Sequence, residues 1–243
     1  MKNIIICVFC SVLYFFPGSN LMAQPQVSAY TDIGLNNVSD GLFLKSALFG
    51  ACRFGKNRVE TGFQIDIINK NHFMFSGYTI NASRDLDIKG LPFELQAFCT
   101  WTSYSEILRE NSWGALFKMR HKRFEMSIGT NFRTYAFRKQ AIIDYKIEKS
   151  AIRIHENFNV MYSFGYYIKK TDDQWNIGLS LTNKDIFIIN QETNPILCLH
   201  GLYKPGSHMC LNAEFRYKTA GTTNLAMNHF GFFFRTGILW NFN

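Results

Sequence analysis

The last stretch of the chain, His229-Phe-Gly-Phe-Phe-Phe-Arg-Thr-Gly-Ile-Leu-Trp-Asn-Phe-Asn243, alternates between two kinds of side chain. Successive side chains of a β-strand point to opposite faces. One face would therefore carry Phe230, Phe232, Phe234, Thr236, Ile238, Trp240 and Phe242, and the other Gly231, Arg235, Gly237 and Asn241. Such a strand suits lipid on one side and water on the other, as in a barrel that spans a membrane.

The composition points the same way. Aromatic residues make up 16% of the chain, with 24 Phe, 11 Tyr and 4 Trp, yet the mean hydropathy is only −0.09. Beyond the first 23 residues, no apolar run approaches the roughly 20 residues that a spanning helix needs. Because backbone polar groups must be bonded internally in lipid, a membrane location would require a closed barrel.

The first 23 residues have the pattern of a secretory signal peptide. Lys2 gives a positive start, an apolar run follows from Ile4 to Phe16, and Leu21-Met22-Ala23 precedes a polar Gln24. This pattern predicts cleavage after Ala23. The alternative is a membrane-anchoring helix, for which the run is short. We therefore expect residues 1–23 to be a signal peptide and residues 24–243 to form one barrel domain.

Period-two alternation bounded by Gly, Pro, Asn and charged clusters predicts twelve antiparallel strands in an all-β, closed transmembrane barrel, with ten as the alternative. The expected spans are 27–36, 41–54, 57–69, 72–83, 89–104, 111–120, 122–137, 151–168, 174–183, 194–204, 207–218 and 229–242. The alternation is weakest in 41–54 and 72–83, where both faces carry apolar residues.

The connections fall into two sets that alternate along the chain. One set is tight or charged: 55–57, 84–89, 120–122, 169–173 and 204–207. The other is longer: 37–40, 105–110, 138–150, 184–193 and 219–228, with a short exception at 69–71. Barrels have short periplasmic turns and longer outer loops, so both termini are expected in the periplasm.

The chain carries a formal net charge of +8, and the excess of basic residues falls in the tight set of connections. Attraction to anionic phospholipid explains a basic rim. Nucleic acid is not expected as a partner, because no basic stripe with stacking aromatics stands outside the alternating pattern.

The faces opposite the apolar ones carry a nearly balanced set of charges. These side chains either pair across a narrow lumen and fill it, or line a small wet pore. The predicted pore-lining residues are Glu60, Gln64, Asp66, Glu94, Lys118, Glu125, Arg133, Asn157, Asn159, Asn212, Glu214, Arg216 and Arg235. On the last strand, Arg235 should face inward among Glu214 and Arg216.

Four cysteines follow the signal segment, namely Cys52, Cys99, Cys198 and Cys210, and none has CxxC spacing. A disulfide is compatible with export, but apolar fillers on strands are favoured. If the connection at Lys204 has three residues, His200 lies opposite Cys210 beside His208, where they could hold zinc. Register decides this, and the favoured interpretation is no metal and no cofactor.

Residues 138–150 form the longest expected outer loop, and their apolar and charged residues alternate. They either fold into the mouth as a constriction, contact an external partner, or extend a strand beyond the membrane.

The signal, the alternating strands and the terminal Gly237-Ile-Leu-Trp-Asn-Phe242 resemble Gram-negative outer-membrane β-barrel proteins, over nearly the whole chain after residue 23. In that class the terminal segment is read by the barrel-insertion machinery and usually ends in an aromatic residue, whereas here Asn243 follows Phe242. The outer-membrane phospholipase of this class uses a His-x-Ser motif that is absent here. His208-Met-Cys210 is the nearest substitute for a nucleophile and base.

We therefore expect an outer-membrane barrel that acts as a small channel or transport component. A non-conducting structural or assembly-partner barrel is the alternative, and a lipid hydrolase is a distant one. Expected partners are outer-membrane lipids, the insertion machinery and a protein at the outer loops. A soluble secreted β-sandwich or barrel is opposed by the exposed Phe-rich faces, which would aggregate in water.

Overall fold

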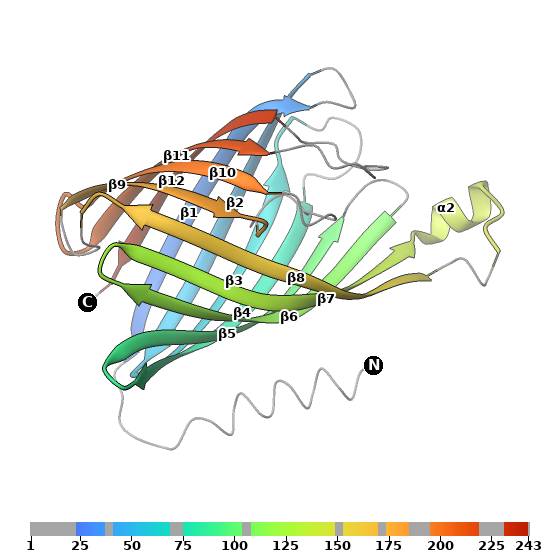
Figure 1. The fold of residues 1–243 in the computed structure, drawn as a ribbon. Helices are drawn as coiled ribbons and strands as arrows, with labels where there is room; N and C mark the ends of the chain where they lie inside the picture. The colour runs from blue at the N-terminus through green and yellow to red at the C-terminus, as the bar shows by residue number, and fades with distance from the viewer. Residues whose placement is uncertain are drawn as a thin grey trace.

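The computed structural model describes residues 23–36, 41–68, 75–103, 108–148, 153–169, 174–184, 195–218 and 231–242. These residues form one closed antiparallel barrel of twelve strands, in which each strand pairs with its neighbours in sequence and the first pairs with the last. Figure 1 shows the tilted strands around the barrel. The prediction of an all-β closed barrel with twelve strands is confirmed, and the alternative of ten strands is wrong.

The strands are β1 (Gln24–Asn36), β2 (Gly41–Phe54), β3 (Asn57–Asp66), β4 (Phe75–Ile88), β5 (Leu91–Ser103), β6 (Leu108–His121), β7 (Phe124–Phe137), β8 (Arg153–Tyr167), β9 (Trp175–Thr182), β10 (Ile196–Tyr203), β11 (Met209–Lys218) and β12 (Gly231–Asn241). A short helix, α2 (Lys139–Asp144), follows β7. Among the described residues, no helix is both long and apolar enough to cross a membrane.

Both ends of the barrel chain lie at the same rim as the tight hairpins. Gln26 on β1 pairs with Asn241 on β12, and Gln24 pairs with Arg53 beside the β2–β3 hairpin. We call this rim the turn end and the opposite rim the loop end. In Figure 1, the C-terminus and the hairpins lie at the left, and α2 lies at the right.

Local backbone chemistry explains two of the hairpins. Lys89 and Gly90 between β4 and β5 both have positive φ, at 55° and 78°, as a two-residue type I′ turn requires. Gly55 between β2 and β3 has φ 58°, and the pairing of Phe54 with Asn57 leaves only two residues in that loop. Each hairpin thus has a glycine, Gly90 or Gly55, at a turn position with positive φ, and glycine adopts this conformation without steric cost. Turns this tight fix the register of the adjoining strands.

The outward face of the barrel is apolar and bears aromatic residues near both rims. Cross-strand aromatic pairs lie toward the loop end (Tyr78 with Trp101, Trp113 with Phe132, Tyr217 with Phe232) and toward the turn end (Phe124 with Tyr166). Exposed aliphatic side chains such as Leu48, Ile128, Leu179 and Leu199 lie on the same face. Aromatic girdles that flank an apolar band are typical of barrels in a membrane.

Inside the barrel, aromatic rings pack over glycines of neighbouring strands. A Cβ at Gly237 would lie 2.3 Å from the Tyr30 ring, and one at Gly178 would lie 2.5 Å from the Tyr167 ring. A separate interior cluster joins β1, β2, β10 and β12, and consists of Phe43, Ala47, Phe49, Ile196 and Phe233 with Tyr30 against it. Part of the interior is therefore filled by side chains.

Several expected boundaries are corrected. Residues 84–88 belong to β4, so the turn is limited to Lys89 and Gly90, and Leu108–Glu110 belong to β6. β3 ends at Asp66 and β4 begins at Phe75, so the expected spans 57–69 and 72–83 are corrected, and the short link predicted at 69–71 lies outside the described residues. The expected signal peptide, residues 1–23, lies outside the described residues except for Ala23.

The segment 138–150 is also corrected in part. A strand extension is wrong for its first half, because Lys139–Asp144 form α2. In Figure 1 this helix lies beyond the end of β7 and away from the strands, rather than inside the barrel. Residues 149 and 150 lie outside the described residues.

Candidate functional site

The interior face of the barrel is polar and charged, and it is the candidate site. Alternate positions on the strands are buried while those between them are exposed, as in the pattern of β9. Since the barrel is closed, the buried positions point inward. Among the residues predicted to line a pore, four are buried: Gln64, Arg133, Arg216 and Arg235.

The other predicted residues occupy the same inward positions at intermediate exposure, namely Glu60, Asp66, Glu94, Lys118, Glu125, Asn159, Asn212 and Glu214. Asn157 lies on β8, but its side chain is outside the described part of the chain. These positions follow from strand alternation, which the sequence carries directly.

Ion pairs bring together inward side chains from β1, β11 and β12. Arg235 binds Asp32 in a bidentate pair, at 2.6 Å from Nε to Oδ1 and 2.7 Å from Nη2 to Oδ2. Glu214 lies beyond this pair, with its Oε2 3.9 Å from Arg235 Nη1 and 3.5 Å from Arg216 Nε. Sequence analysis placed Arg235 among the β11 charges but missed Asp32, its closest partner. The pairing of Asp32 with Arg235 in register depends on the closure of β12 against β1.

Further pairs lie elsewhere on the inner wall of the barrel. Lys118 Nζ is 3.4 Å from Glu94 Oε2 between β6 and β5, and Arg120 Nε donates to Glu125 Oε2 at 2.7 Å between β6 and β7. On β3, Glu60 binds Arg58 and accepts a hydrogen bond from Asn81 of β4 at 2.9 Å. These interior charges therefore offset one another within short distances.

One interior contact spans several strands. Lys184 follows β9, and its Nζ donates to Gln96 Oε1 of β5 at 3.2 Å. It also lies 5.4 Å from the centre of the Phe98 ring. Since β6, β7 and β8 separate β5 from β9 in the wall, this side chain crosses part of the lumen. Sequence analysis placed Lys184 in an outer loop and gave it no role.

The register of β10 and β11 corrects the proposed neighbour of His200. Tyr203 pairs with Leu211, and His200 pairs with Glu214 rather than with Cys210. The connection includes residues 204–208 and is longer than three residues. His200 therefore lies beside Cys198 and Glu214, with Cys198 Sγ 3.4 Å from His200 Nδ1.

The His208 and Cys210 side chains each contact a backbone carbonyl instead of forming a nucleophile and base. His208 Nδ1 is 3.3 Å from the carbonyl oxygen of Asn241, and Cys210 Sγ donates to the carbonyl oxygen of Leu211 at 3.8 Å. All four cysteines in the described chain are free thiols. This geometry gives no support to catalysis by His208 and Cys210.

No protein-family model and no curated protein sequence matches the chain. The fold is nevertheless similar to those of solved structures. The KdgM porin is 11% identical with a TM-score of 0.54, and the match covers 90% of this chain and 99% of that one.

Two further matches have lower scores. The Acinetobacter baumannii outer membrane protein Omp33 is 10% identical with a TM-score of 0.47, covering 92% and 100% of the two chains. The translocator domain of autotransporter NalP from Neisseria meningitidis is 9% identical with a TM-score of 0.47, covering 99% and 96%. At 11% identity the likeness to the KdgM porin shows the fold alone, and that fold is the closed β-barrel of outer-membrane proteins.

Proposed function

We propose that this protein is an outer-membrane β-barrel with a narrow, largely charge-filled lumen, acting as a small channel or transport component. Residues 1–23 would export it, and the turn end would face the periplasm. Exposed basic side chains gather at that end, including Lys56, Lys89, Lys122 and Arg123. They would lie beside anionic phospholipid headgroups of the inner leaflet.

The observation that carries the proposal is the opposite character of the two faces of one closed sheet. The outward face exposes large apolar side chains on strand after strand, which would be costly in water. The inward face carries the charged side chains. Water can reach such an interior only along the barrel axis, so polar solutes are the class that the lumen would accept.

Two observations support a narrow lumen. The Lys184 side chain reaches β5 from the end of β9, and the aromatic cluster around Phe43 and Phe233 occupies interior space between β2, β10 and β12. Barrels with few strands leave little room once side chains fill them. The proposed pore-lining residues would then act mainly by pairing with each other.

Conductance in planar bilayers tests this function. The purified protein should give small, discrete conductance steps, and Lys184→Ala should increase them because it removes a side chain that crosses the lumen. Lys56→Ala, in the exposed β2–β3 turn, is the matched control and should leave the steps unchanged. The absence of conductance steps, or steps of the same size in the Lys184→Ala variant and the unmodified protein, would contradict a lumen narrowed at this contact.

A non-conducting barrel that binds a protein partner is the second candidate, and α2 favours it. Ile143 on α2 is 69% exposed and Tyr145 just beyond it is 65% exposed, and Figure 1 shows this segment beyond the strand ends. Exposed apolar side chains outside the barrel wall suit a protein contact. Silent bilayers together with a partner that is lost in an Ile143→Ser, Tyr145→Ser variant would support this candidate over a channel.

A further inference from the structure

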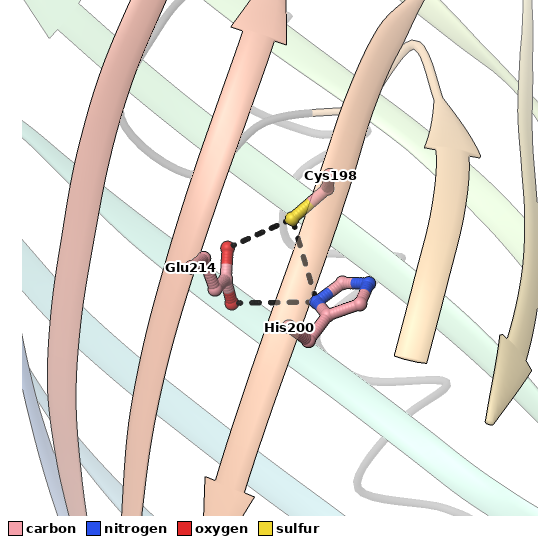
Figure 2. Close-up of side chains that lie close together, drawn as sticks. All are labelled: Cys198, His200 and Glu214. Carbon is pink, nitrogen blue, oxygen red and sulfur yellow. Dashed lines mark hydrogen bonds and ion pairs between the residues drawn. The ribbon is translucent and has the colours of Figure 1, made fainter. Parts of the chain in front are cut away.

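Three potential metal ligands face one another on the inner wall of the barrel. Cys198 and His200 lie two residues apart on β10, and Glu214 lies opposite His200 on β11. Figure 2 shows the thiol, the imidazole and the carboxylate converging on the same side of the sheet. Cys198 is buried and the other two are partly buried.

We propose that Cys198, His200 and Glu214 form a binding site for a zinc-class transition metal ion inside the barrel. Thiolate sulfur, imidazole nitrogen and carboxylate oxygen are the protein ligands that Zn²⁺ takes. A soft thiolate beside an imidazole disfavours Mg²⁺ and Ca²⁺, which prefer sites made of oxygen ligands.

The distances between the ligand atoms suit a tetrahedral ion. Zn–S near 2.3 Å and Zn–N or Zn–O near 2.1 Å place neighbouring ligand atoms about 3.4–3.6 Å apart. In the structure, Cys198 Sγ lies 3.4 Å from His200 Nδ1 and 3.5 Å from Glu214 Oε2, and His200 Nδ1 lies 3.9 Å from Glu214 Oε1. Only small side-chain movements would therefore bring all three onto one ion.

The surroundings of His200 hold its ring in a suitable orientation. Ser180 Oγ on β9 lies 2.6 Å from Nε2, and Tyr167 stacks on the ring at 5.9 Å between centroids. If Nε2 carries the proton and donates a hydrogen bond to Ser180 Oγ, then Nδ1 presents its lone pair toward Cys198 and Glu214. A partner on the second ring nitrogen is a general feature of metal-binding histidines.

Two arginines lie near the Glu214 carboxylate, and a bound cation would share that carboxylate with them. Arg235 is engaged mainly by Asp32 at 2.6 Å, and its nearest contact with Glu214 is longer, at 3.9 Å. Arg216 lies 3.5 Å from Oε2, while Oε1 accepts a hydrogen bond from Asn212 at 2.8 Å. Binding would release the proton that Cys198 shares with Glu214, because the metal takes the thiolate form.

Three protein ligands leave a fourth tetrahedral position, which water or a solute in the lumen would occupy. The metal would tie β10 to β11 at mid-wall whether or not the barrel conducts. Its test is therefore independent of the channel proposal.

The experiment is metal titration of the full-length protein purified from membranes and kept reduced. We expect one equivalent of Zn²⁺ per chain by elemental analysis, and with Co²⁺ a thiolate-to-metal charge-transfer band. Cys198→Ser should abolish that band. Ser180→Ala should keep the band while weakening the affinity for the metal by about 10–100-fold, as loss of a hydrogen-bond partner of a metal-binding histidine does.

Cys210→Ser is the matched control, because that thiol lies on the same strand as Glu214 but outside the site. This variant should bind the metal like the unmodified chain.

Less than one equivalent in the unmodified chain, or a charge-transfer band that survives Cys198→Ser, would overturn the proposal. Heat-dependent gel mobility would show that each variant is folded. If Cys198→Ser fails to fold, alkylation of the unmodified protein decides the matter. Zn²⁺ should then protect Cys198 while leaving the alkylation rate of Cys210 unchanged, and equal rates for Cys198 with and without Zn²⁺ would refute the site.

Discussion

The pair between Asp32 and Arg235 is the most deeply buried ionic contact among those described at the interior. Asp32 is 0% and Arg235 3% exposed, and the guanidinium donates a hydrogen bond to each carboxylate oxygen. A buried pair is costly to desolvate, and its geometry must be excellent to offset that cost. The pair joins β1 to β12, the two strands whose pairing closes the barrel, and we call it the seam pair. Any stability that it adds therefore holds the barrel closed.

Breaking this pair should destabilise the protein strongly. Arg235→Ala leaves the Asp32 carboxylate buried without its partner, so we expect the free energy of unfolding to fall by about 3–5 kcal/mol. Urea unfolding in lipid vesicles measures this. The double variant Asp32→Ala, Arg235→Ala should lose less than the sum of the two single variants.

Arg53 provides the control for that prediction. It pairs with Asp85 at 3.2 Å, but both side chains are more than 40% exposed. Arg53→Ala should cost about 1 kcal/mol or less. Equal losses for Arg53→Ala and Arg235→Ala would show that the seam pair has no special role.

The interior glycines give a second prediction for single residues. Gly237→Ala would place a methyl group 2.3 Å from the Tyr30 ring, so the ring must move, at a cost of about 1–3 kcal/mol. Gly50→Ala is the control, because nothing lies within 4 Å of the added carbon. Unfolding experiments that give the same stability for both variants would contradict this packing.

For single residues, the sequence predicts which face of the sheet a side chain lies on better than it predicts which residue lies opposite on the next strand. Strand alternation was enough to place Glu94, Lys118 and Arg235 on one face. It could not pair His200 with Glu214, because that pairing depends on the length of the connection around Lys204 and a shift of one residue reverses the faces. The spacing of Cys198 and His200 on one strand was a signal that could have been used, since residues two apart share a face.

At the scale of the element, the strands follow from alternation and turn chemistry together. β9 shows this most simply, with Trp175, Ile177, Leu179 and Leu181 outward and the residues between them buried. The ends of strands were harder to predict. β4 continues through Arg84, Asp85 and Asp87, because strand pairing with β5 persists to the Lys89-Gly90 turn. Charged residues near a rim can stay in a strand, since water reaches them there.

A charge on the outward face of β9 tests the assignment of that face to lipid. Leu179 is 57% exposed, and we place it near the middle of the apolar band. Leu179→Arg should therefore cost about 2–4 kcal/mol in a bilayer. Ser207→Arg in the exposed β10–β11 connection should change stability by about 0.5 kcal/mol or less. Tolerance of Leu179→Arg in vesicles would place this face in water.

α2 illustrates what alternation cannot predict. Its residues follow the strand pattern closely enough to suggest an extension of β7, yet the structure forms a helical turn at Lys139–Asp144. The described pairing of β7 ends at Phe137 with β6 and at Ala136 with β8, and beyond that point a helix can bond its own backbone polar groups. The alternation of apolar and polar residues therefore no longer predicts a strand beyond the point where the sheet ends.

For the whole molecule, the central claim is that a closed barrel presents its outer surface to lipid between two aromatic belts. All four tryptophans bear on this claim. Trp101 and Trp113 occupy outward positions toward the loop end, and Trp175 and Trp240 occupy outward positions toward the turn end. Lys169 places its amine 3.5 Å from the centre of the Trp175 ring, as a cation at a membrane interface would.

Tryptophan fluorescence quenching in vesicles tests the claim most directly and needs no variant. Phospholipids brominated near the headgroup should quench most of the emission, those brominated at the end of the acyl chain should quench less, and aqueous iodide should quench little. Strong quenching by iodide with none by brominated lipid would contradict the account, because it would place the apolar outer face in water.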